Sequence, residues 1–185
     1  TSVLMDDNAR TAWKNKCVFS CFQLEKKDHA TAYVNGSRNN PYYDESGYNN
    51  DGTQNQITYT SNSNNGSYCA SFNGTHSYIE VPNWKPTLPN EPYTIAFWVN
   101  PGENKTRDVY FGNHPTTNGT FNIERNTSNY LRVYYNSDTP IGPISAITIP
   151  DSVWTHIVMT FDGTTFKAYK DGVEKYSKAL NQTLS

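Results

Sequence analysis

The sequence predicts an all-β protein built as an antiparallel sandwich or barrel, and three observations lead to this. Short runs rich in β-branched and aromatic residues alternate with turn formers along much of the 185-residue chain. Asp-Gly pairs at 162–163 and 171–172 separate alternating segments near the C-terminus. No segment carries a sustained helical period with capping residues. Many short strands joined by regular turns are typical of two packed sheets or a closed barrel.

The first half of the chain contains few strong strand signals. A first strand is expected at 17–24, and residues 35–51 are nearly all turn formers. A second strand is expected at 56–60. Segments 68–72 and 77–81 flank Asn73-Gly74, a pair typical of tight turns, so they are expected to form a hairpin.

The second half carries the strongest strand patterns. Segment 93–99 is largely apolar on both faces, which predicts a central strand covered on both sides. The two Asp-Gly pairs predict a three-stranded meander. The expected strands after residue 100 lie at 109–111, 120–124, 131–135, 146–149, 154–161, 165–170 and 173–177.

The length of the chain fits one sandwich domain with a sizeable core, and is too short for two ordinary domains. We expect residues 1–38 to form an N-terminal arm that includes a first strand. We expect residues 39–185 to form the sandwich, without its last strand or strands.

Composition argues against several classes of partner. The formal net charge is -2 and only 17% of residues are charged, so neither nucleic acid nor an anionic membrane is an expected partner. No apolar run approaches the roughly 18 residues needed to span a bilayer, so membrane insertion is not expected. The three cysteines, Cys17, Cys21 and Cys69, lack the paired spacing of a zinc site.

Four segments in order resemble the concanavalin-A-like lectin/glucanase superfamily, and in particular the laminin-G-like modules of bacterial surface and phage virion proteins. These segments are 43–53, 70–80, 93–99 (YTIAFWV) and 154–172, which runs from WTHIVMTFDG to YKDG. The resemblance implies a jelly-roll sandwich of two antiparallel sheets packed face to face.

Catalysis is not expected. The glycan-hydrolysing members of this superfamily carry Glu-x-Asp-x-x-Glu on one strand, and no Glu of this chain has an Asp two residues later. Hydrolysis needs two carboxyl groups about 5 to 9 Å apart. We therefore expect a non-enzymatic protein.

Exposed aromatic side chains that stack on pyranose rings are the expected sugar-binding groups. Trp98 and His156 lie within the strand segments, where residues of this kind most often pack against a sheet face. The candidate ligand-binding residues lie in loops or at strand ends: Trp84, Tyr110, Tyr130, Tyr134 and Tyr135.

The resemblance also implies a calcium ion at the rim of the sandwich. Asp44, Asn49 and Asp51 supply hard oxygen ligands in one loop. The alternative is that these side chains close Asx turns, a common use of Asn and Asp in loops.

These observations together lead to an expected function. We expect a non-catalytic adhesion module on a cell or virion surface, outside the cell, with a glycan or a surface protein as ligand. The alternative is a structural or assembly domain of a phage virion or surface layer, with homo- or hetero-oligomers formed through an open sheet edge.

Overall fold

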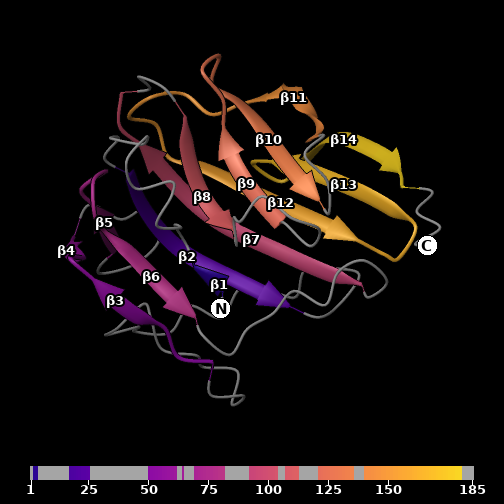
Figure 1. Cartoon of the computed structure of the whole chain (residues 1–185). Coiled ribbons are helices and arrows are strands. Elements are labelled where there is room, and N and C mark those ends of the chain that lie inside the picture. Colours follow the sequence, from indigo (N-terminus) through magenta and orange to yellow (C-terminus); the bar gives the residue numbers. More distant parts are fainter. Residues whose placement is uncertain are drawn as a thin grey trace.

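The computed structural model describes residues 2–3, 17–25, 50–61, 64, 69–81, 92–103, 107–112, 121–135 and 140–180. Side chains at 2–3, 17–25, 135, 140 and 143 lie outside this description. The described residues form two seven-stranded sheets, here sheet A and sheet B, and contain no helix. Figure 1 shows the sheets stacked as two layers. The expected antiparallel sandwich is therefore confirmed, and the described residues hold no helix able to cross a bilayer.

Sheet A carries the candidate site. All of its strand pairs are antiparallel. In spatial order its strands are β11 (Pro140–Thr148), β10 (Tyr130–Tyr135), β9 (Phe121–Arg125), β8 (Asp108–Gly112), β1 (Ser2–Val3), β6 (Tyr78–Val81) and β3 (Thr53–Asn55).

Sheet B lies behind it and is also antiparallel throughout. In spatial order its strands are β14 (Val173–Ala179), β13 (Thr165–Lys170), β12 (Thr155–Phe161), β7 (Tyr93–Pro101), β2 (Cys17–Glu25), β5 (Cys69–Phe72) and β4 (Thr58–Thr60). The expected central strand is β7, which is hydrogen-bonded to β12 on one side and β2 on the other.

The main core lies between the sheets and is built from alternate residues of their strands. Ile95, Phe97 and Val99 of β7 have at most 1% of their surface exposed. They form one apolar cluster with Ile123 of β9 and Leu131 of β10. Full burial of a large apolar side chain contributes about 1.5–3 kcal/mol, so this layer holds the two sheets together.

The N-terminal residues join both sheets. β1 lies between β8 and β6 in sheet A, and β2 lies between β7 and β5 in sheet B. The strand expected at 17–24 is therefore present. Its position inside a sheet means that this part of residues 1–38 belongs to the sandwich rather than to an arm.

The expected hairpin around Asn73-Gly74 is wrong. β5 pairs with β4 and β2 in sheet B, whereas β6 pairs with β1 and β3 in sheet A. Asn73 Oδ1 accepts hydrogen bonds from the backbone amides of Thr75, His76 and Ser77. This wider turn carries the chain from one sheet to the other, and Ala70, Phe72 and Ile79 form a second apolar cluster beside it.

The expected C-terminal meander is confirmed, because β12, β13 and β14 pair consecutively. Both Asp171 and Gly172 have positive φ angles, of 50° and 80°. Positive φ at both central residues is the geometry of a type I′ hairpin turn, which explains the Asp-Gly pair.

Candidate functional site

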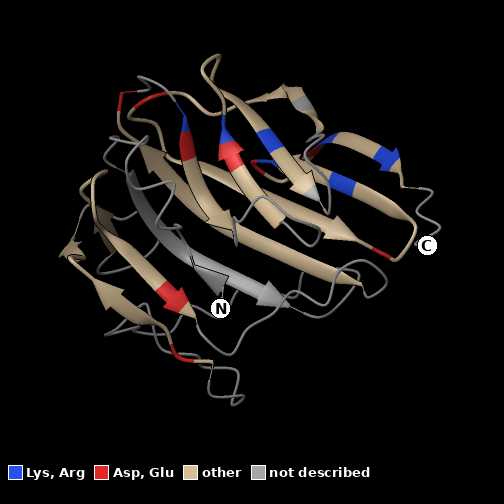
Figure 2. Ribbon diagram, viewed as in Figure 1, with Lys and Arg blue, Asp and Glu red and all other residues tan. Residues whose placement is uncertain are grey.

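Strand β9 sends charged side chains to both faces of sheet A. Phe121 and Ile123 point into the core, so Arg125, two residues further, points the same way. Asn122 and Glu124 therefore point to the opposite, outer face. Figure 2 shows acidic and basic bands close together on β8, β9 and β10.

The register of β10 completes the outer face. Arg132 lies opposite Glu124 and Tyr134 lies opposite Asn122. Arg107, which directly precedes β8, reaches the same carboxylate. We call these five residues, Arg107, Asn122, Glu124, Arg132 and Tyr134, the outer-face cluster.

Glu124 is the centre of the outer-face cluster. Its side chain has 0% exposure, whereas Arg107 and Arg132 are 33% and 22% exposed. Arg132 donates from Nε and pairs through Nη2 to the same oxygen, Glu124 Oε1. Arg107 Nε lies 3.2 Å from Glu124 Oε2, and Asn122 Nδ2 donates to that oxygen at 3.3 Å. One buried carboxylate thus holds two partly exposed guanidinium groups.

Several polar groups of the outer-face cluster have hydrogen-bonding capacity left over. Among the described residues, Arg132 Nη1 and the Tyr134 hydroxyl make no hydrogen bond or ion pair; Arg132 Cζ lies 5.4 Å from the Tyr134 ring centroid. Asn122 Oδ1 is buried and accepts no hydrogen bond from the residues that the structure describes. A guanidinium donor beside an aromatic ring is typical of ligand-binding surfaces.

Gly112 lies beside Asn122 on the neighbouring strand. A Cβ atom there would lie 2.8 Å from the Phe121 carbonyl oxygen and 2.9 Å from Asn122 Oδ1. The sheet therefore requires glycine at this buried position. Glycine within a strand is typical of close approach by another backbone, here that of β9.

The inner face of β9 carries a different arrangement, which we call the inner cluster: Arg125, Asp108 and Asp151. Arg125 is fully buried and donates from Nε to Asp108 Oδ2 at 2.7 Å and from Nη1 to Asp151 Oδ1 at 2.6 Å. It also donates to the carbonyl oxygens of Ile149 and Gly102, at 3.0 and 2.9 Å. This guanidinium ties four chain segments together at one end of the sandwich.

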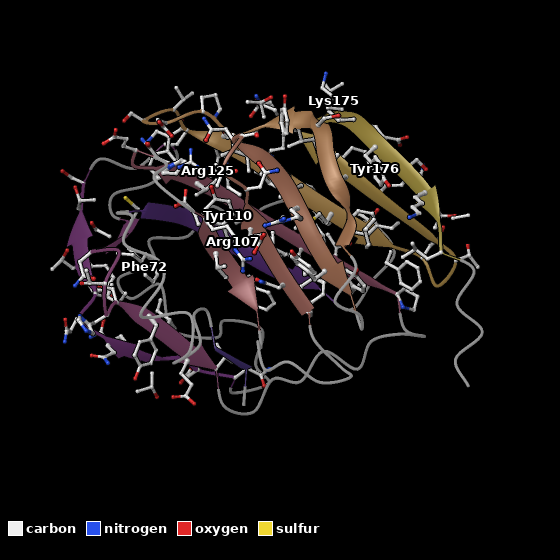
Figure 3. The ribbon with its side chains drawn as sticks, turned by 45° about the horizontal axis from the view of Figure 1, so that its top comes forward. Phe72, Arg107, Tyr110, Arg125, Lys175 and Tyr176 are labelled. Carbon is white, nitrogen blue, oxygen red and sulfur yellow. The ribbon has the colours of Figure 1, made fainter. Side chains whose placement is uncertain are left out.

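The charge of Arg125 is stabilised where it lies. Burial alone would lower the pKa of Arg125, but the electrostatic influence of Tyr110 and Asp108 and the hydrogen bonds to Asp151 and Asp108 raise the pKa overall. Figure 3 shows Arg125 and Tyr110, which belong to the neighbouring strands β9 and β8 of sheet A. Because Arg125 stays ionised, the inner cluster is a permanent ion-pair network.

The fold and the comparisons with known proteins agree. A family model described as the concanavalin A-like lectin/glucanases superfamily, of the laminin G type, matches residues 73–185, which is more than half of the chain. The chain belongs to this superfamily. No curated protein and no solved structure matches the chain.

The superfamily includes glucanases, which hydrolyse glycans with a pair of carboxyl groups. We therefore compare the positions of the carboxylates on the outer face of this laminin-G-type module. Among the described residues of β8, β9 and β10, Glu124 is the one carboxylate on that face. Glu80 lies on β6, three strands from β9, which is roughly 14 Å at about 4.8 Å per strand. A glycosidase pair lies about 5 to 9 Å apart, so these two glutamates do not form one.

Among the tyrosines that the sequence singled out, Tyr134 lies in the outer-face cluster. Tyr110 has 1% exposure, and its ring centroid lies 5.9 Å from that of Phe97 in the core. The buried ring of Tyr110 therefore presents no face for a sugar. Tyr130 is partly exposed at the start of β10, opposite Thr148 of β11. The Tyr135 side chain and Trp84 lie outside the described residues.

The calcium ligands remain a prediction. Asp44 and Asn49 lie outside the described residues, and Asp51 is exposed. Within the described ranges, no three or more His, Cys, Asp or Glu side chains gather as a metal site would require.

The outer face of sheet B carries an aromatic pair. Trp98 and His156 lie opposite each other on β7 and β12, and their rings stack with centroids 4.9 Å apart. Burial lowers the pKa of His156, and Asp171 offsets part of that effect. Both side chains are half-buried, so they pack on the sheet face, as the strand patterns indicate.

Sequence reasoning missed Arg107, Asn122, Glu124 and Arg132. The sequence does contain a pattern that indicates three of them: polar residues alternate with core residues in both FNIER and YLRVYY. Only the pairing of β9 with β10 places Glu124 opposite Arg132, and that register is not encoded in either strand alone.

Proposed function

We propose that this protein is a non-catalytic module that binds carbohydrate through the outer face of sheet A. The observation that carries the proposal is the outer-face cluster, in which buried Glu124 fixes two partly exposed arginines beside Tyr134. A sugar offers hydroxyl groups that both donate and accept hydrogen bonds. The Nη1 group of Arg132 and the hydroxyl of Tyr134 complement these groups.

The environment of Glu124 supports binding rather than hydrolysis. A general acid must hold and release a proton near neutral pH, usually because burial without cations raises its pKa. Glu124 instead has guanidinium groups on both oxygens. Both oxygens are engaged by arginines, so this carboxylate is suited to holding those arginines in place.

The proposal places the module outside the cell, on a cell or virion surface, where it acts in adhesion. Its uncharged polar composition supports an exposed setting: 17% of residues are charged, and Asn, Ser, Thr and Tyr supply much of the remaining polarity. The ligand there is a glycan or a glycosylated surface protein.

A glycan array tests this function directly. We expect the wild-type protein to bind at least one class of oligosaccharide and the Tyr134→Ala variant to lose most of that signal. The matched control is Tyr176→Ala on β14 of sheet B, which removes a tyrosine from another part of the fold. Loss of binding in both variants, or binding in neither wild type nor variants, would contradict the proposal.

A structural or assembly role is the second candidate, and β14 favours it. This strand lies at the edge of sheet B, where it pairs with β13, and nearly all its residues are exposed. An open edge can add a strand from another chain. Measuring the molar mass in solution separates the two roles: a monomer that binds glycans supports the module, and an oligomer that binds none supports assembly.

A further inference from the structure

We infer that the outer-face cluster selects acidic saccharides, meaning sugars that carry a carboxylate or a sulfate group. This inference rests on the proposed function and names its ligand class.

Arg132 contacts one oxygen atom of Glu124 with two of its nitrogens. Nε and Nη2 both contact Glu124 Oε1, so Nη1 is directed elsewhere. Within the described part of the chain, Nη1 makes no hydrogen bond or ion pair. A guanidinium attracts an anion through a Coulomb interaction that a neutral hydroxyl does not offer. The remaining donor therefore gives an acidic group an advantage over a hydroxyl.

Glu124 acts as a positioning residue for this donor. It is the buried partner and contacts Arg132 through one oxygen and Arg107 through the other. The carboxylate thus fixes two guanidinium groups next to each other on the sheet face. A ligand anion meets side chains that are already ordered, which lowers the entropy lost on binding.

Tyr134 provides contacts for the rest of the sugar. Tyr134 is half-buried next to Arg132, and its hydroxyl makes no hydrogen bond with other described residues. Anion and ring are therefore recognised by different members of the same cluster.

The decisive probe is a matched pair of ligands: an oligogalacturonate and its methyl ester, which keeps the rings and removes the charge. A sulfated oligosaccharide and its desulfated form make a second pair that distinguishes the two anionic groups. We expect at least one acidic ligand to bind about tenfold more tightly than its neutral partner, because the ion pair with Arg132 adds a Coulomb attraction that the neutral ligand lacks. The preference should fall as salt concentration rises, since the arginines are partly exposed.

Variants test which residue carries the preference. Arg132→Gln should bring the acidic and neutral forms to within about threefold of each other, and Arg132→Lys should retain part of the difference. Lys175→Gln on β14 is the control, because it removes an exposed cation from the other sheet and should leave the preference unchanged.

The outcomes separate the acidic preference from the carbohydrate-binding function. Equal binding of acidic and neutral partners by wild-type protein would overturn the acidic preference while the carbohydrate-binding function stands. An array of neutral, uronate-containing, sialylated and sulfated glycans with no bound member would overturn both. The comparison of ligand pairs uses wild-type protein, so it does not depend on the folding of any variant.

Discussion

Two adjacent residues of β9 illustrate how one type of interaction serves two purposes. Arg125 lies on the inner face with two carboxylates and two backbone carbonyls around it. Glu124 lies on the outer face with two arginines that remain partly exposed. On the inner face, all three guanidinium nitrogens of Arg125 bind groups of the protein. On the outer face, Arg132 Nη1 is directed away from Glu124. The first arrangement stabilises the fold, and the second leaves capacity for a ligand.

The largest expected effect is on the inner cluster. Arg125→Ala should lower the free energy of unfolding by about 3–5 kcal/mol, because it leaves Asp108 buried without its guanidinium. Urea denaturation followed by tryptophan fluorescence measures this change. Lys175→Ala is the control and should alter stability by less than about 0.5 kcal/mol. A loss below about 1 kcal/mol for Arg125→Ala would contradict a structural role for the inner cluster.

Glu124→Gln should affect both stability and binding. We expect a stability loss of about 1.5–3 kcal/mol, smaller than for Arg125→Ala because the released arginines can reach water. Acidic ligands should bind at least about tenfold more weakly, as the arginines are no longer fixed. Glu124→Asp keeps the carboxylate and should recover part of the affinity. If Glu124→Asp and Glu124→Gln bind alike, positioning by the carboxylate is wrong.

Gly112→Ala tests the tight contact beside the outer-face cluster. The added methyl group meets a backbone oxygen at 2.8 Å, so we expect a stability loss of about 1–2 kcal/mol. Gly142→Ala is the matched control within the same sheet, since its Cβ would meet nothing closer than 3.6 Å. Thermal unfolding of the two variants gives the comparison. Equal melting temperatures would show that the sheet adjusts at Gly112 without cost.

The smallest effect concerns His156 on the other sheet. Burial lowers its folded pKa, so its contribution to stability is present above the unfolded value of about 6.5 and is lost as pH falls through the folded pKa. Wild-type protein should therefore lose more stability between pH 7 and pH 5 than the His156→Gln variant. Denaturation curves at both pH values measure the difference, and parallel losses would exclude His156 as the source.

Much of the architecture could be read from residue patterns. The alternation in YTIAFWV identifies β7 as a central strand, and the Asp-Gly pairs identify the meander of β12, β13 and β14. Local rules failed at Asn73-Gly74, where the same turn chemistry joins strands of different sheets. The turn residues permit both geometries, and strand partners far along the chain select between them.

The sequence by itself determined the fold class, the position of most strands and the superfamily, because the alternation of apolar residues and the turn formers act over a few residues. Only the tertiary structure decided the candidate site. Glu124, Arg132 and Arg107 come from separate segments, and their meeting depends on the register between β9 and β10 and on the start of β8. That register is set by how both sheets fill the shared core, which no single segment encodes.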